Sequence, residues 1–149
     1  MRLTRTFEEF VSEGVVNKRK SDVLRAKSLI EESDRDYKFS KMILSSIGFR
    51  YESMNYFVVS SYDILIKLIR ARFIIDGFFS SGEGAHEAEI SYMRKLGFSE
   101  KETLIMNDLR YHRNGIQYYG KSFDENYARK VLEFLDRMYP ILKNIAGKM

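Results

Sequence analysis

A basic and aromatic stretch, DLRYHRNGIQYYG (residues 108–120), carries the side chains best suited to chemistry on an anion. Arginine presents a planar fork of donors that matches phosphate oxygens, amides both donate and accept, and tyrosine rings stack on bases. Successive helical residues are about 100° apart, so most of these groups share one helical face. The residues expected to bind a nucleotide or RNA phosphate are Arg110, Arg113, Asn114, Gln117, Tyr118 and Tyr119.

A catalytic interpretation of the same stretch assigns roles to His112 and Arg113. His112 would be a general base oriented by Asp108 one turn earlier, and Arg113 would stabilise charge on the phosphate. The structural alternative places His112 at the edge of the apolar face and the arginines in polar pairs on a solvated surface. Gly115 costs up to ~1 kcal/mol relative to alanine inside a helix, and it would allow a ligand or another backbone to come close.

Asp63 and Lys67 are charged residues within an otherwise apolar stretch. They lie four residues apart with the acid first, which is the favourable order for an intrahelical ion pair. If they are buried, mutual neutralisation is one role, because an unpaired buried charge is costly. Lining a cleft beside Arg113 is the other, so both are included among the candidate binding residues.

Helical periodicity dominates the chain and predicts an all-α fold, an antiparallel up-and-down bundle of four to five helices with no sheet. We expect one domain, residues 1–149, in which residues 1–20 form an N-terminal extension with one short helix. Capping-box spacing marks helix starts at Thr6, Ser99 and Ser122. The longer helices are expected over residues 21–47, 53–75, 85–96, 99–119 and from 122–124 onward, and Pro140 is expected to kink or end the last one.

Composition excludes several classes of site. The chain has no cysteine, and His86 and His112 do not share a metal-ligand spacing, so we expect no disulfide, metal or cofactor. The net charge of +4 permits an anionic partner without requiring one. A second basic cluster, NKRK (residues 17–20, continuing to Arg25), is interpreted as solvated surface. Without a signal peptide or an apolar span, we expect a cytoplasmic protein with no membrane partner.

The pattern of motifs resembles the HEPN family of small helical bundles, over residues 21 to 146. The likeness rests on Arg113-Asn114 in LRYHRNGIQYYG, on the following SFDENYARKVLEFLDRM, and on DILIK (residues 63–67). In that family many members are metal-independent endoribonucleases, often toxins, that dimerise so that two motifs form one cleft. Others are non-cleaving partners of small nucleotidyltransferases.

One position departs from the family pattern. Tyr118 stands where the family places its histidine, and a tyrosine with a reference pKa near 10 is a poor base at neutral pH. The resemblance therefore implies a homodimer that binds RNA or nucleotide phosphate through Arg113 and Asn114 at the dimer groove, without efficient cleavage. The alternatives are a toxin-type endoribonuclease with an antitoxin partner, and a non-catalytic partner of a minimal nucleotidyltransferase.

Overall fold

The computed structural model describes residues 4–148 of the 149-residue chain. Within that range it contains six α-helices, one 3-10 turn and one two-stranded sheet. In chain order the elements are α1 Phe7–Ser12, β1 Val16–Lys18, α2 Val23–Ser46, α3 Tyr51–Ile75, β2 Phe78–Ser80, α4 Ala85–Ser91, the turn η1 Tyr92–Arg94, α5 Glu100–Tyr119 and α6 Glu125–Ala146. The mostly helical fold expected from the sequence is confirmed.

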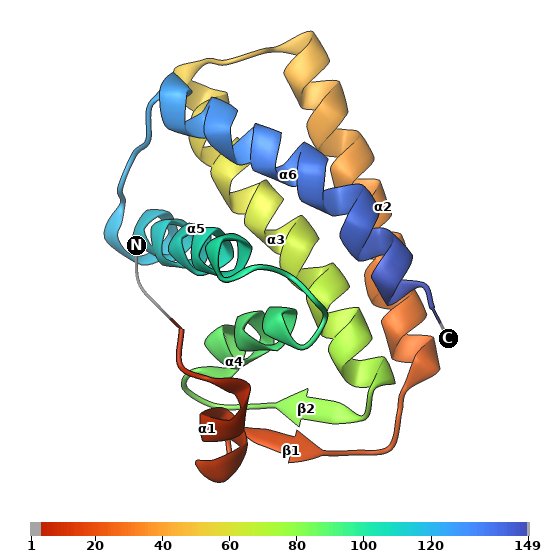
Figure 1. Cartoon of the computed structure of the whole chain (residues 1–149). Helices are drawn as coiled ribbons and strands as arrows, with labels where there is room; N and C mark the ends of the chain where they lie inside the picture. The colour runs from red at the N-terminus through yellow and green to blue at the C-terminus, as the bar shows by residue number, and fades with distance from the viewer. Residues whose placement is uncertain (1–3, 149) are drawn as a thin grey trace.

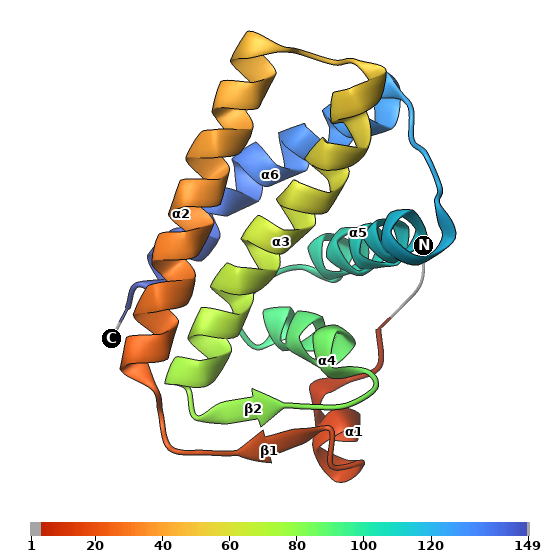
Figure 2. The same ribbon diagram turned by 180° about the vertical axis from the view of Figure 1, so that it is seen from behind.

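Three long helices form the body of the fold. α2 and α3 are antiparallel neighbours, and α6 packs on α3 while running in the same general direction as it (Figures 1 and 2). α5 runs across these helices, so that both views show it nearly end-on, and α4 and the sheet lie at the far end of α3. The antiparallel up-and-down order thus describes α2 and α3, whereas α5 crosses the bundle.

α3 is the central element because its neighbours cover most of its circumference. Its fully or almost fully buried apolar residues are Phe57, Val58, Tyr62, Ile64, Leu65, Ile66, Leu68, Ile69, Ala71 and Phe73. A helix that is apolar nearly all round must be covered on several sides, as the sequence indicated. Each large side chain among them contributes about 1.5–3 kcal/mol through removal from water. No helix within residues 4–148 has the combination of length and apolarity needed to cross a membrane.

The two-stranded sheet contradicts the expectation of no sheet. β1 pairs with β2 in antiparallel register, with Val16 opposite Ser80 and Lys18 opposite Phe78. Each strand has only three residues, which is too short to show the alternation that marks a strand in sequence. Residues 4–20, described above as an extension, pack on the bundle: Phe7 and Phe10 join Phe73 in a second apolar cluster.

Most helix boundaries follow their predicted caps. Thr6 and Ser99 accept hydrogen bonds from the third residue of their helices, as the capping-box spacing predicted. The cap of α6 is Asp124 rather than Ser122, because the Asp124 side chain is the one that accepts from the Tyr127 N–H. Pro140 does not end α6, which continues to Ala146.

Candidate functional site

The polar residues of α5 divide between two surroundings instead of forming one continuous patch. The helix begins at its Ser99 cap and ends at Gly120, whose positive φ of 65° is the left-handed conformation that glycine adopts without strain. Arg110 and Arg113 contact charged groups of α3 and α4. Asn114 and Tyr118 instead line a hollow at the C-terminal end of α5.

Arg113 is held between helices with several donors unused. Its side chain is 17% exposed, and its Nη2 lies 3.3 Å from Oδ1 of Asp63 on α3. Its Nη1 donates a long hydrogen bond of 3.5 Å to Oδ1 of Asn114. Within the described part of the chain, its buried Nε has no hydrogen-bond partner. A guanidinium has five donor hydrogens, so Arg113 retains capacity for another acceptor.

Asp63 offers incomplete compensation for that charge. Burial raises the pKa of the Asp63 carboxyl above its usual value, although the positive charge of Arg113 acts in the opposite direction. Burial therefore disfavours the charged form of Asp63, and an anion beside Arg113 would compete with this carboxylate for the guanidinium.

Within residues 4–148 Lys67 forms no direct ion pair with Asp63, although its positive charge acts with that of Arg113 to lower the pKa of Asp63 against the effect of burial. Its Nζ bonds Asp36 Oδ2 at 2.8 Å and lies 3.7 Å from Glu32 Oε2, both on α2. The acidic segment of α2 reaches Lys67 from a neighbouring helix, and Asp63 turns to Arg113. Of these two candidates, therefore, only Asp63 is brought to Arg113 by a direct contact.

Arg110 belongs to a charged network around α4. Its Nε donates to Oδ1 of Asn107 at 2.9 Å, and its Nη2 lies 3.7 Å from Glu87 Oε1. The neighbouring His86 has its Nδ1 3.4 Å from the hydroxyl of Tyr62. Burial lowers the pKa of His86, and so do three guanidinium groups nearby, those of Arg70, Arg113 and Arg110.

The hollow at the end of α5 is a cavity of about 250 Å³. It is lined by Tyr111, His112, Asn114, Gly115, Tyr118, Tyr119 and Lys121. Tyr118 and Tyr119 are 70% and 79% exposed. The Lys121 side chain lies against Gly115, where an added Cβ would be 3.4 Å from Cδ of Lys121, an ordinary van der Waals contact. Gln117 is exposed on α5 and does not line this hollow.

Lys121 is a lining residue that the sequence analysis missed. Two constraints place it: its N–H donates to the Gly115 carbonyl, and its own carbonyl accepts from the Asn55 amide of α3. The sequence does contain a signal for this placement. Lys121 directly follows Gly120, and a glycine that ends a helix commonly turns the chain back across the last helical turn.

His112 is packed in an aromatic cluster. Its Nδ1 lies 2.6 Å from the hydroxyl of Tyr127 on α6, and its ring centroid is 4.9 Å from that of Phe123. Asp108 is 3.7 Å from the same nitrogen, which is the neighbour expected from the helical spacing. Burial raises the pKa of Tyr127, so its hydroxyl stays protonated. His112 thus connects α5 to α6, and only Nε2 would be available for proton transfer.

A groove between α5 and α6 adjoins this cluster. Its cavity is about 420 Å³, and its apolar lining comprises Ile105, Leu109, Tyr127, Val131 and Phe134. The charged residues that line it are two acids and two bases: Asp108, Glu133, Lys130 and Arg137. The groove gives this side of the bundle an apolar floor with balanced charges.

Comparisons of the chain with protein-family models, with curated proteins and with solved structures gave no match.

Proposed function

We propose that the protein is a HEPN-like homodimer that binds RNA or nucleotide phosphate at the C-terminal half of α5, without efficient cleavage. The observation that carries this proposal is the guanidinium of Arg113. It is largely buried, and its polar contacts within residues 4–148 are two, at 3.3 Å to Asp63 and at 3.5 Å to Asn114, which lines the adjoining hollow. A charged donor with unused hydrogens in such a position favours a phosphate oxygen as an additional partner.

The exposed tyrosines supply the second part of the binding surface. Tyr118 and Tyr119 present their rings to solvent beside Asn114 and Lys121. Stacking of a base on an aromatic ring is worth about 1–3 kcal/mol and tolerates any sequence. Lys121 adds a positive charge that could contact the phosphate backbone of the nucleic acid whose bases stack on these rings. The arrangement suits a single-stranded segment with splayed bases better than a duplex.

The groove between α5 and α6 supports the homodimer. Its apolar floor and its equal numbers of acids and bases are compatible with self-association across a twofold axis, which needs a self-complementary surface. Joining two such grooves would bring the hollows of both protomers near one another, because His112 and Tyr127 connect the hollow to the groove.

Cleavage is the weaker alternative because of the position of His112. A general base must reach the ribose 2′-hydroxyl within hydrogen-bonding distance. His112 lines the hollow with a side chain that is 27% exposed, but its Nδ1 contacts the Tyr127 hydroxyl and its ring packs on Phe123 and Tyr127, which favours a role in holding α5 against α6. Tyr118 occupies the position of the family histidine, and a phenol is a poorer general base than an imidazole at neutral pH.

Fluorescence anisotropy with a labelled single-stranded RNA, recorded in EDTA, tests the proposal. We expect Tyr118→Ala and Tyr119→Ala to weaken binding about tenfold each, whereas Phe39→Ala, which removes another exposed ring, leaves it unchanged. Arg113→Ala, combined with Asp63→Asn to keep the local charge balanced, should weaken binding and reduce its salt dependence. RNA binding that is indifferent to all three changes on α5 would remove the proposal.

Gel analysis of the same RNA separates binding from cleavage. We expect intact RNA after incubation in EDTA. Cleavage that disappears in His112→Ala, with the fold retained by circular dichroism, would instead establish the metal-independent endoribonuclease.

A further inference from the structure

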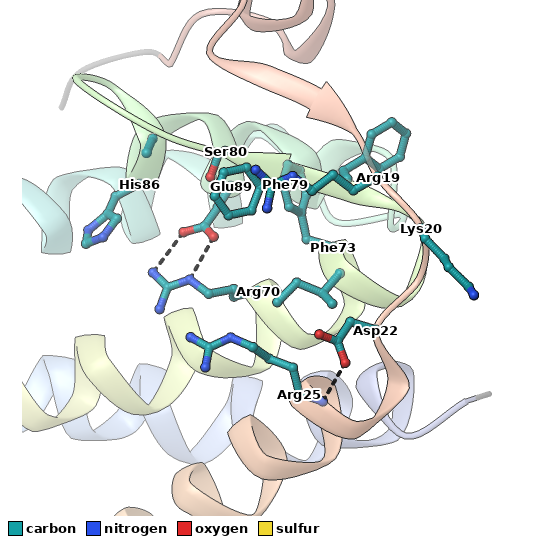
Figure 3. A pocket seen from close by; sticks show the side chains of 13 residues that line it. Arg19, Lys20, Asp22, Arg25, Arg70, Phe73, Phe79, Ser80, His86 and Glu89 are labelled. Atoms are coloured by element: carbon teal, nitrogen blue, oxygen red, sulfur yellow. Dashed lines mark hydrogen bonds and ion pairs between the residues drawn. The ribbon is translucent and has the colours of Figure 1, made fainter.

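A second hollow lies at the opposite end of α3 from Tyr51, enclosed by the β1–α2 connection, the start of α2, β2 and α4 (Figure 3). Its volume is about 460 Å³, within the range of small-molecule sites. Four cationic side chains line it: those of Arg19, Lys20, Arg25 and Arg70. It has no described lining residue in common with the hollow at the end of α5.

The charge of this second hollow is not balanced by its carboxylates. Asp22 caps α2 by accepting from the Arg25 N–H, and Glu89 is paired with Arg70. Among residues 4–148, no carboxylate lies within ion-pairing distance of the side chains of Arg19, Lys20 or Arg25. By contrast, Arg110 and Arg113 of α5 each face a carboxylate, Glu87 or Asp63. The lining of this second hollow therefore carries four basic and two acidic side chains, an excess of positive charge.

Glu89 orients the guanidinium of Arg70 and leaves its Nη1 available. Its Nε and Nη2 donate to the two oxygens of Glu89 at 2.7 and 2.9 Å, as the dashed lines in Figure 3 show. Nη1 has no hydrogen bond within the described chain. Arg25 projects from α2 into the same hollow. Two guanidinium groups from adjacent helices are thus offered to one acceptor, which is the pattern that suits a phosphate.

An aromatic surface adjoins these cations. The guanidinium carbon of Arg19 lies 3.6 Å from the ring centroid of Phe79, which is a close stack of two planar groups. Phe78 and Ile74 add further partly exposed apolar surface to the lining. Planar ligands stack both on arginine and on aromatic rings, so a ring system could extend this stack.

We propose that this second hollow binds a small phosphorylated ligand with a planar ring, of the mononucleotide class, at a site separate from the surface on α5. Arg25 and Nη1 of Arg70 hold the phosphate, and the Arg19–Phe79 stack holds the ring. The volume accommodates a ligand larger than free phosphate, and the exposed positions of Arg19, Lys20 and Arg25 leave the entrance open.

Calorimetric titration of the full-length chain tests this site, with adenosine 5′-monophosphate, inorganic phosphate and adenosine as probes. We expect the monophosphate to bind more tightly than either of its parts. Arg25→Ala should weaken it about tenfold or more, because a charge-assisted hydrogen bond is lost. Lys27→Ala is the matched control: it removes the same charge from the same helix, outside the lining, and should have little effect.

A second variant and a spectroscopic measurement make the result specific. Phe79→Ala should weaken the monophosphate but not inorganic phosphate. His86 lines the hollow, and its neighbours include Tyr62 and the guanidinium groups of Arg70, Arg110 and Arg113. A bound phosphate would offset that positive charge, so the pKa of His86, followed by NMR, should rise when the monophosphate binds.

Three results would overturn the assignment, and the third concerns the surface on α5. The first is no binding of the monophosphate at millimolar concentration by a chain that is folded by circular dichroism. The second is equal affinity of Arg25→Ala and Lys27→Ala. The site is also distinguished from the surface on α5, because Tyr118→Ala should leave binding of the monophosphate unchanged. If Tyr118→Ala weakened it as much as Arg25→Ala, the two sites would not be separate and the proposal would fail.

Discussion

The ion pair between Arg70 and Glu89 provides a quantitative test of how charge is held in this fold. The Glu89 side chain is 4% exposed and that of Arg70 is 24% exposed, and two parallel hydrogen bonds join them. Removing one partner of such a pair leaves the other with an uncompensated charge, at a cost of about 3–5 kcal/mol. We therefore expect Glu89→Ala to lower the free energy of unfolding by about that amount.

The pKa shifts of Glu89 and Arg70 show how burial and mutual attraction oppose each other in this pair. Burial raises the pKa of Glu89, and the hydrogen bonds from Arg70 oppose that change. For Arg70, burial is the largest single influence and disfavours the charge, but the hydrogen bonds and charge of Glu89, with smaller contributions from Tyr62 and Asp63, together raise its pKa. Because desolvation offsets much of the attraction, the pair as a unit should contribute little. The double variant Arg70→Met/Glu89→Leu should therefore unfold within about 1–2 kcal/mol of the unmodified chain.

Urea denaturation followed by circular dichroism measures these differences, with a surface pair as the control. Arg129 and Glu125 form an i,i+4 pair whose side chains are 56% and 51% exposed. Glu125→Ala should cost no more than about 0.5 kcal/mol. If Glu89→Ala were as mild as Glu125→Ala, or if the double variant were less stable than Glu89→Ala, the reasoning about the buried pair would be refuted.

Two further predictions concern α6. Hydrogen bonds from Lys143, Tyr139 and Lys38 lower the pKa of Asp34 below its ordinary value of 3.8; since a depressed pKa stabilises the fold above the ordinary value, Asp34→Asn should destabilise at pH 7. In urea titrations the difference should shrink as the pH falls below 3.8 through the lowered pKa, and a difference that grew on acidification would contradict this. Pro140 lies exposed inside α6 and cannot donate to the preceding turn, so Pro140→Ala should raise the free energy of unfolding by about 1–3 kcal/mol in the same assay; a loss of stability would contradict it.

The helices could be predicted because their signals are local. A cap such as Thr6 or Ser99 acts within its own first turn, and Gly120 ends α5 through its own backbone conformation. The sheet could not be predicted in this way. Its two strands come from segments about 60 residues apart, and nothing in either three-residue segment specifies the other. Only the packed bundle brings Val16 and Ser80 into register.

For the candidate site, too, the sequence predicted ion pairs within one helix but not those between helices. Helical spacing correctly put Asp108 beside His112, since that geometry belongs to one helix. Helical spacing also placed Lys67 near Asp63, but Nζ of Lys67 instead pairs with Oδ2 of Asp36 on α2, at 2.8 Å. An ion pair goes to the closest well-placed partner, and partners from other helices do not appear in a helical wheel.

Pairing between helices also changes which of the two basic segments has unpaired positive charge in the folded chain. Arg110 and Arg113 form the denser cluster in sequence, yet Glu87 and Asp63 from other helices offset their charges. Arg19 and Arg25 look like solvated surface in sequence, yet the β1–α2 connection places them at a hollow with Arg70. Attraction for an anion depends on the charge that remains after internal pairing. Within the described chain Arg19 and Arg25 form no ion pair, so the site proposed at the start of α2 would depend on unpaired charge, whereas the surface proposed on α5 would depend on stacking and on the unused donors of Arg113.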